Sequence, residues 1–172
     1  DGLKFKTGIF TNLSHDHLDY HKNFKDYLKS KLYLFEKLLK KDSNIITDIE
    51  ISEYKKIKKI ALKRKLNIET ISNKSSNLHI ISHKYLQNKQ LIEIKYKNKI
   101  YTFKTGLIGK IQIKNILMAM LAAEKSGLNF TQINNVINKV KPVSGRLEEI
   151  GSIKNSSKVI LDYAHTPGAL ET

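Results

Sequence analysis

The chain contains no cysteine, no tryptophan and only two prolines among its 172 residues. The absence of cysteine excludes disulfides, thiolate metal sites and cysteine nucleophiles, so a cytosolic setting is the default expectation. No run approaches the roughly 18 consecutive apolar residues of a membrane-spanning helix, and the first residues carry no signal-peptide pattern. We therefore expect a cytoplasmic protein with no membrane span.

Arginine is also scarce. The chain has 31 Lys plus Arg against 16 Asp plus Glu, a formal net charge of +15, yet only Arg64 and Arg146 are arginines. Nucleic-acid recognition favours the forked guanidinium group, whereas 23 Ile, four Val and 14 Asn indicate a bias towards A/T-rich codons. We interpret most lysines as a solvated surface and expect no nucleic-acid partner. A lysine-rich nucleic-acid-binding module, whose binding would depend on salt, is the non-enzyme alternative.

Hydrophobic residues make up 40% of the chain, enough for the core of one domain or slightly more. Apolar periodicity and turn residues predict, in chain order, a strand over 6–11, a helix over 24–39, a strand over 44–47, a helix over 51–66, an antiparallel three-stranded meander over 78–105, helices over 111–126 and 131–140, and short strands over 146–150 and 158–161. Thr131 is the expected N-cap of the last helix. The pattern predicts an α/β fold with a small antiparallel β insert.

The loop after the first predicted strand gathers three histidines and two aspartates between His15 and His21. Such residues serve as metal ligands or proton shuttles. One interpretation is a binuclear metal-dependent hydrolase with zinc or manganese on His15 and His17, although Tyr20 stands where its His-x-His-x-Asp-His motif has the final histidine. The other interpretation is a polar surface loop.

Lys31 falls within the apolar stripe of the predicted helix over 24–39. A lysine in a buried stripe is uncommon unless it is paired or modified. Burial lowers the pKa of an amine, and a neutral amine can add carbon dioxide to become a carbamate, which is an oxygen ligand. Alternatively, the ammonium group of Lys31 reaches the solvent from the edge of the stripe.

Two further candidates lie near the end of the chain. Arg146 follows the flexible turn at Gly145, and Asp162 and His165 follow the last predicted strand. Ligands of open α/β sheets bind at the carboxyl ends of strands, so both segments are plausible edges of a site.

Taken in this order, these segments resemble the Mur ligases, ATP-dependent amide-forming enzymes of peptidoglycan precursor synthesis. The resemblance covers nearly the whole chain and is carried by Phe10-Thr11-Asn12-Leu13-Ser14-His15-Asp16-His17-Leu18-Asp19-Tyr20-His21, 27–31, 109–115 with the helix after it, 143–148, and Asp162-Tyr163-Ala164-His165-Thr166-Pro167. The first and last motifs are most similar to family members that add diaminopimelate or lysine to UDP-N-acetylmuramoyl-L-alanyl-D-glutamate (the UDP-MurNAc-dipeptide).

The resemblance implies ATP and Mg²⁺ as cofactors and assigns roles by position. The implied roles are a magnesium ligand for His17, a carbamylated magnesium-binding lysine for Lys31, an adenine contact for Asn115, a phosphate contact for Arg146, a ribose contact for Asp162, and a place near the nucleotide for His165. Gln112 departs from the Asn that is usual at its position but keeps an amide group.

The resemblance also implies the organisation of the chain. Residues 1–144 would form the latter half of the central ATP-binding domain, a mostly parallel sheet flanked by helices, and 145–172 the linker and first strand of a Rossmann-like C-terminal domain. The chain contains no Gly-x-x-Gly-Lys-Thr phosphate loop, so we expect it to be an internal fragment that is inactive alone. The intact enzyme is expected to act as a monomer.

Overall fold

The computed structural model describes residues 3, 5–14, 20–87, 89–153, 157–166 and 170. In chain order the elements are β1 (Phe5–Phe10), α1 (Phe24–Tyr33), the π-helix η1 (Leu34–Leu38), β2 (Leu39–Asp48), α2 (Tyr54–Arg64), β3 (Asn67–Ser72), β4 (Leu78–Tyr85), β5 (Gln90–Tyr96), β6 (Lys99–Thr105), α3 (Lys110–Lys125), α4 (Phe130–Val136), the 3₁₀-helix η2 (Ile137–Lys139), β7 (Glu148–Ile153) and β8 (Ser157–Leu161).

The main sheet has six strands in the order β1-β2-β3-β4-β5-β6. Strands β1 to β4 pair in parallel, whereas β4, β5 and β6 form an antiparallel meander. The predicted α/β class with a mostly parallel sheet is confirmed. The meander continues the parallel sheet through the short β3–β4 pairing at Ile71 and Ser72, rather than forming a separate sheet.

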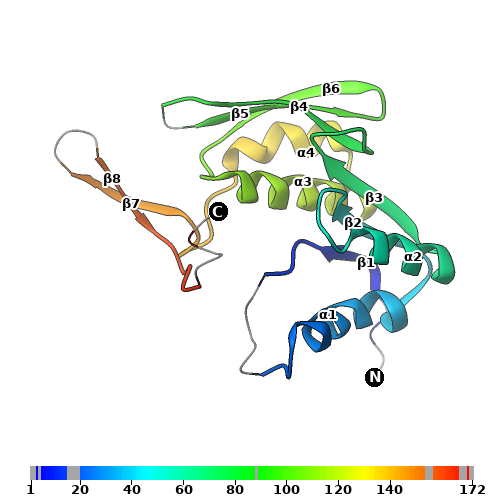
Figure 1. Ribbon diagram of the computed structural model, residues 1–172. Coiled ribbons are helices and arrows are strands. Elements are labelled where there is room, and N and C mark those ends of the chain that lie inside the picture. The colour runs from blue at the N-terminus through cyan, green and yellow to red at the C-terminus, as the bar shows by residue number, and fades with distance from the viewer. Residues whose placement is uncertain are drawn as a thin grey trace.

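Helices cover both faces of the sheet (Figure 1). Neighbouring residues of β2 point to opposite faces, because side chains alternate along a strand. Ile46 belongs to the core formed with α3, α4 and the meander, and Ile45 belongs to the core formed with α1, η1 and α2. The sheet therefore places α1 and α3 in different layers, and both layers reach the carboxyl end of β1.

Several sequence predictions differ from the structure, among them the strand predicted over 44–47, which is only part of β2. The helix predicted over 24–39 ends as the π-helix η1, and Leu39 already belongs to β2. Strand β3 was not predicted. The expected cap Thr131 is wrong: α4 is capped by Asn129, whose side chain accepts hydrogen bonds from the backbone N–H groups of Thr131 and Gln132.

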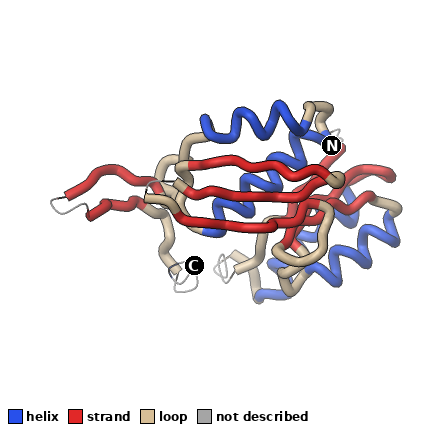
Figure 2. The backbone as a smooth tube through the Cα atoms, turned by 90° about the horizontal axis from the view of Figure 1, so that it is seen from above, coloured by secondary structure: helices blue, strands red, loops and turns tan. Residues whose placement is uncertain are grey.

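Strands β7 and β8 form a separate antiparallel hairpin. It projects away from the six-stranded sheet, as both views show (Figures 1 and 2). None of its described residues is buried. Across the described part of the chain, the helices are too short or too polar to cross a lipid bilayer.

Candidate active site

A cleft of about 630 Å³ opens at the carboxyl end of β1. Its walls come from the end of β1 and the loop after it, from α1, from the first turns of α3, from the linker before β7 and from the segment after β8. Five of the six predicted site residues line it: Lys31, Asn115, Arg146, Asp162 and His165. The sixth, His17, lies outside the described residues.

The wall formed by β1 and α1 is rich in oxygen atoms. Thr11, Asn12 and Ser14 line the cleft directly after β1. The ammonium group of Lys31 donates a hydrogen bond of 3.1 Å to the carbonyl oxygen of Asn12 and lies 4.8 Å from the centre of the Tyr27 ring. Lys31 is half-buried at the edge of the apolar stripe, so it faces the cleft instead of the core.

Tyr27 contacts both His21, in the loop before α1, and Lys31, in the last turn of α1. Its ring stacks on the imidazole of His21 with 4.9 Å between ring centres, and the Lys31 ammonium group lies near the same ring. Tyr27 was not predicted as a site residue, although its spacing of four residues from Lys31 places both on one helix face. Over the part of the chain that the structure describes, no three His, Asp or Glu side chains converge as a metal site.

The wall formed by α3 depends on Gly109, its N-cap. Gly109 has a φ of 85°, and a Cβ atom there would lie 2.9 Å from Cδ1 of Leu147. Glycine tolerates this backbone conformation and leaves room for the linker. The linker therefore packs against the start of α3, beside the cleft-lining Gln112 and Asn115.

One backbone hydrogen bond and one cation–π contact join the linker to the segment after β8. The Tyr163 N–H donates to the Gly145 carbonyl at 2.8 Å, and the Arg146 guanidinium lies 5.3 Å from the centre of the Tyr163 ring. The Asp162 carboxylate accepts from the Ala164 N–H at 3.0 Å. These contacts bring Arg146 and Asp162 to one rim of the cleft.

His165 has a defined ring orientation on this rim. Its Nδ1 atom lies 2.8 Å from the Tyr163 carbonyl oxygen, which can only accept a hydrogen bond, so Nδ1 carries the proton. The contact holds the ring at the rim of the cleft, which His165 lines.

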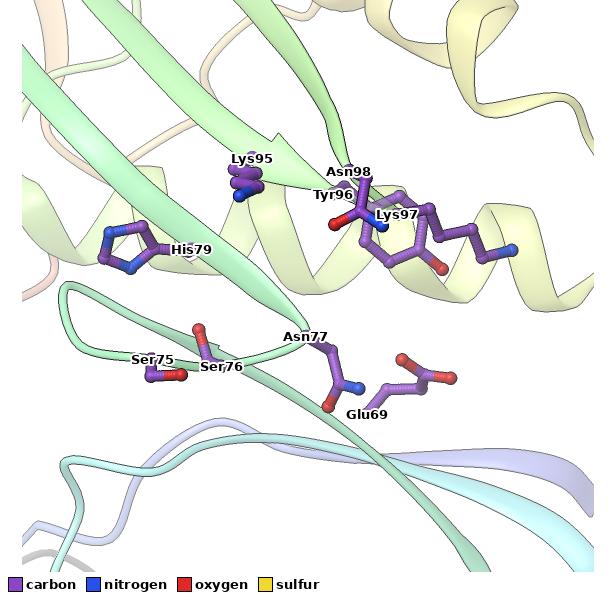
Figure 3. A pocket seen from close by; sticks show the side chains of 9 residues that line it. All are labelled: Glu69, Ser75, Ser76, Asn77, His79, Lys95, Tyr96, Lys97 and Asn98. Carbon is purple, nitrogen blue, oxygen red and sulfur yellow. The ribbon is translucent and has the colours of Figure 1, made fainter.

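A second hollow, of about 580 Å³, lies between the β3–β4 loop and the β5–β6 turn (Figure 3). Several of its polar groups are already paired: Glu69 with Lys125, Asn77 with Thr70, and His79 with the carbonyl of Lys74. Burial raises the pKa of Tyr96, on its wall, to about 12. The hollow contains none of the predicted site residues, so the cleft at β1 is the better candidate.

Comparison with known proteins identifies relatives of this chain. The family described as Mur ligase middle domain matches residues 1–123. A UDP-N-acetylmuramoyl-L-alanyl-D-glutamate–2,6-diaminopimelate ligase of Rickettsia bellii is 37% identical over 169 residues, which cover 98% of this chain and 35% of the relative. The chain thus spans about a third of the length of that curated relative.

Solved structures give the same fold. The structure of a UDP-N-acetylmuramoyl-L-alanyl-D-glutamate–2,6-diaminopimelate ligase is similar with a TM-score of 0.78 and 24% identity, covering 96% of this chain and 34% of that one. The crystal structure of the MurF ligase from Thermotoga maritima in complex with ADP is similar with a TM-score of 0.77 and 16% identity, covering 97% of this chain and 38% of that one.

Proposed function

The chain belongs to the Mur ligase family, and from this premise we propose that it is part of a cytoplasmic, ATP-dependent ligase that adds diaminopimelate to UDP-N-acetylmuramoyl-L-alanyl-D-glutamate. The observation that carries the proposal is the cleft at β1. It gathers side chains from five separate segments, among them five of the six residues to which the resemblance assigns roles. A structural relative in complex with ADP supports a nucleotide as the occupant.

The chemistry of the cleft suits ATP. In this proposal the guanidinium of Arg146 contacts the phosphates, because its planar fork pairs with phosphate oxygens. The amide of Asn115 offers both a donor and an acceptor to adenine, and the carboxylate of Asp162 accepts hydrogen bonds from ribose hydroxyls. His165 lies on the same rim and would face the nucleotide.

The opposite wall suits magnesium. Mg²⁺ prefers oxygen ligands, and Thr11, Asn12 and Ser14 place oxygen atoms along the cleft beside Lys31. We propose that His17 and a carbamylated Lys31 hold the metal. Bound magnesium would neutralise charge on the transferring phosphoryl group. An unmodified Lys31 ammonium group would repel the metal, so carbamylation is the state in which this residue can act as a ligand.

The proposed reaction has two steps. A side-chain carboxylate oxygen of D-glutamate attacks the γ-phosphorus of ATP and ADP leaves, which gives an acyl phosphate. The amine of diaminopimelate then attacks the acyl carbon and loses a proton, and phosphate leaves as the amide forms. Arg146 stabilises the charge on the phosphoryl group in the first step and on the departing phosphate in the second.

We also propose that residues 1–144 belong to the central ATP-binding domain and 145–172 to the start of the next domain. The separate β7–β8 hairpin and its exposed side chains support a boundary near Gly145. Because Asp162 lies beyond that boundary, ATP would be held from both domains, and domain closure would complete the site.

The two arginines of the chain provide the test. In the ligase that carries this chain, we expect Arg146→Ala to lower the rate of ATP-dependent amide formation by at least about 100-fold, since a lost charge-stabilising donor typically costs about 3 kcal/mol. Arg64→Ala is the matched control, because Arg64 binds the Leu39 carbonyl and is not part of the cleft wall. Equal activity of the Arg146 variant and the wild type would contradict the proposed function.

A further inference from the structure

Two clusters of ion pairs hold α3 against the sheet. Near its start, Nζ of Lys114 lies 2.5 Å from Oδ2 of Asp48 and 3.2 Å from Oε2 of Glu50. In its last turn, Nζ of Lys125 lies 2.5 Å from Oε1 of Glu69. Lys114 and Lys125 are eleven positions apart, about three helical turns, so both project from the same side of α3.

The cluster at Lys114 is built from a buried acid. The Asp48 side chain is 1% exposed and lies at the carboxyl end of β2. Its Oδ1 atom accepts a hydrogen bond of 2.8 Å from the Glu50 N–H, which leaves Oδ2 to Lys114. Burial lowers the pKa of Lys114, but its bonds to Asp48 and Glu50 outweigh this effect and raise the pKa above its ordinary value. The ammonium group is therefore charged at neutral pH.

This cluster compensates for a weak helix start. The N-cap Gly109 provides no side-chain hydrogen bond, and the first turn of α3 has no acidic residue. A side-chain hydrogen bond from the N-cap and acidic residues in the first turn normally stabilise the start of a helix. Lys114 is the nearest ionic anchor to Asn115, the next residue along, which lies on the cleft wall.

The ion pairs of Lys114 oppose rotation of α3 about its axis, in addition to the packing of its buried apolar side chains. Helical side chains extend about 5 Å from the axis, so a rotation of about 20° would move the amide of Asn115 by about 2 Å. A shift of that size would carry the amide out of hydrogen-bonding distance of the base, and loss of such a bond costs about 1 kcal/mol or somewhat more, which is up to about tenfold in affinity. Precise placement of Asn115 therefore requires that α3 neither rotate about its axis nor slide along it.

We propose that Lys114, anchored by Asp48 and Glu50, is a positioning residue that sets the orientation of Asn115 towards the base of a bound nucleotide. The inference deepens the proposed function and rests on it, because it requires Asn115 to contact the nucleotide. It gives the Lys114 cluster a role that the cluster at Lys125 does not share, since Lys125 lies ten residues from Asn115.

The test compares two lysines in the ligase that carries this chain. We expect Lys114→Met to raise KM for ATP about tenfold, with kcat and the KM values for the other two substrates nearly unchanged. Lys125→Met is the matched control, which should lower Tm but leave KM for ATP unchanged. Lys114→Arg should restore most of the affinity, because it keeps the charge between the two acids.

A second variant guards against misfolding. Lys114→Met leaves the Asp48 carboxylate buried without its lysine partner, whereas the double variant Asp48→Asn with Lys114→Met leaves no buried charge unpaired, because Glu50 is exposed. The double variant should fold better and still show the raised KM for ATP. Equal KM values for ATP in the wild type and in both Lys114→Met variants, or equal increases in the Lys114 and Lys125 variants, would overturn the positioning role.

The Asn115→Ala variant distinguishes the nucleotide contact of Asn115 from the positioning role of Lys114. An increase in KM for ATP in this variant, without one in Lys114→Met, would refute the positioning role and leave the nucleotide contact intact. An unchanged KM for ATP in Asn115→Ala would refute the nucleotide contact proposed for Asn115, and the positioning role with it.

Discussion

Replacing Lys31 with arginine or alanine separates its role as a cation from its proposed role as a metal ligand. In the structure the Lys31 ammonium group makes two contacts that need only a positive charge, with the Asn12 carbonyl and the Tyr27 ring. Arginine can make both contacts. It cannot form the same carbamate, so only the metal-binding role is lost in Lys31→Arg.

The structural contacts set the expected loss of stability. A cation–π contact at a partly exposed site contributes about 0.5–1 kcal/mol, and a hydrogen bond from a charged donor about 1 kcal/mol when solvent is near. Lys31→Ala should therefore cost about 1–2 kcal/mol, which corresponds to a fall in Tm of roughly 2–8 °C. Lys31→Arg should cost less than about 1 kcal/mol because both contacts are kept.

The expected loss of activity is much larger. Loss of a metal ligand that supports phosphoryl transfer removes several kcal/mol of transition-state stabilisation, and about 4 kcal/mol corresponds to about 1,000-fold in rate. Both Lys31 variants of the ligase should therefore be nearly inactive while they remain folded.

The assay is ATP-dependent phosphate release in the presence of the UDP-dipeptide and diaminopimelate, run beside thermal unfolding. Short carboxylic acids added to the Lys31→Ala variant should partly restore activity by occupying the position of the carbamate. A Lys31→Arg enzyme with wild-type activity, independent of dissolved carbon dioxide, would refute the metal-binding role.

Three further predictions follow from the structure. The 172-residue chain alone should not hydrolyse ATP above the level of its Lys31→Ala variant, and turnover of ATP by the chain would contradict the proposal that it is part of a longer ligase. Gly109→Ala should lower the urea midpoint by an amount equivalent to about 1–2 kcal/mol, because its φ is positive and its Cβ would lie 2.9 Å from the linker, whereas Gly106→Ala, with no atom within 4 Å, should not. Burial alone would raise the pKa of Glu50 and Glu124, but neighbouring lysines outweigh it and hold both pKa values below the usual range. The stability they contribute is therefore present above about pH 4.3 and lost as the pH falls through the lowered pKa values, so denaturant titrations should show Glu→Gln variants less stable than wild type at pH 7 and equal to it in strong acid.

The sequence predicted the elements with strong periodicity. Helix α3 and the meander β4 to β6 were expected within a few residues of their observed bounds, because each has a regular apolar pattern. Strand β3 was missed because two of its three buried residues, Thr70 and Ser72, are polar, and only Ile71 is apolar. The hydroxyl of buried Thr70 donates a hydrogen bond to Asn77, and that of buried Ser72 accepts one from the Lys74 N–H. These partners cannot be identified from a local sequence pattern.

The candidate site was found largely through motifs. Five predicted residues do line one cleft. Their proximity depends on the packing of the linker against Gly109 and on the backbone hydrogen bond from Tyr163 to Gly145. The ion pairs of Lys114 with Asp48 and Glu50 could not be predicted, since Glu50 and Lys114 are 64 residues apart in the sequence. Among the chain's many lysines, no local pattern distinguishes the one that meets a buried acid.

The β7–β8 hairpin has a practical consequence for handling this chain. Within the described residues, each of its strands has one edge that pairs with no other strand, so its backbone N–H and C=O groups are available to another molecule. Ile150, Ile153, Ile160 and Leu161 are each at least 38% exposed along it. Unpaired edges that carry apolar side chains promote association between strands of different molecules. Concentrated solutions of the chain should therefore self-associate through this hairpin, and a lysine at Ile153, near the tip of β7, would reduce that association without touching the cleft.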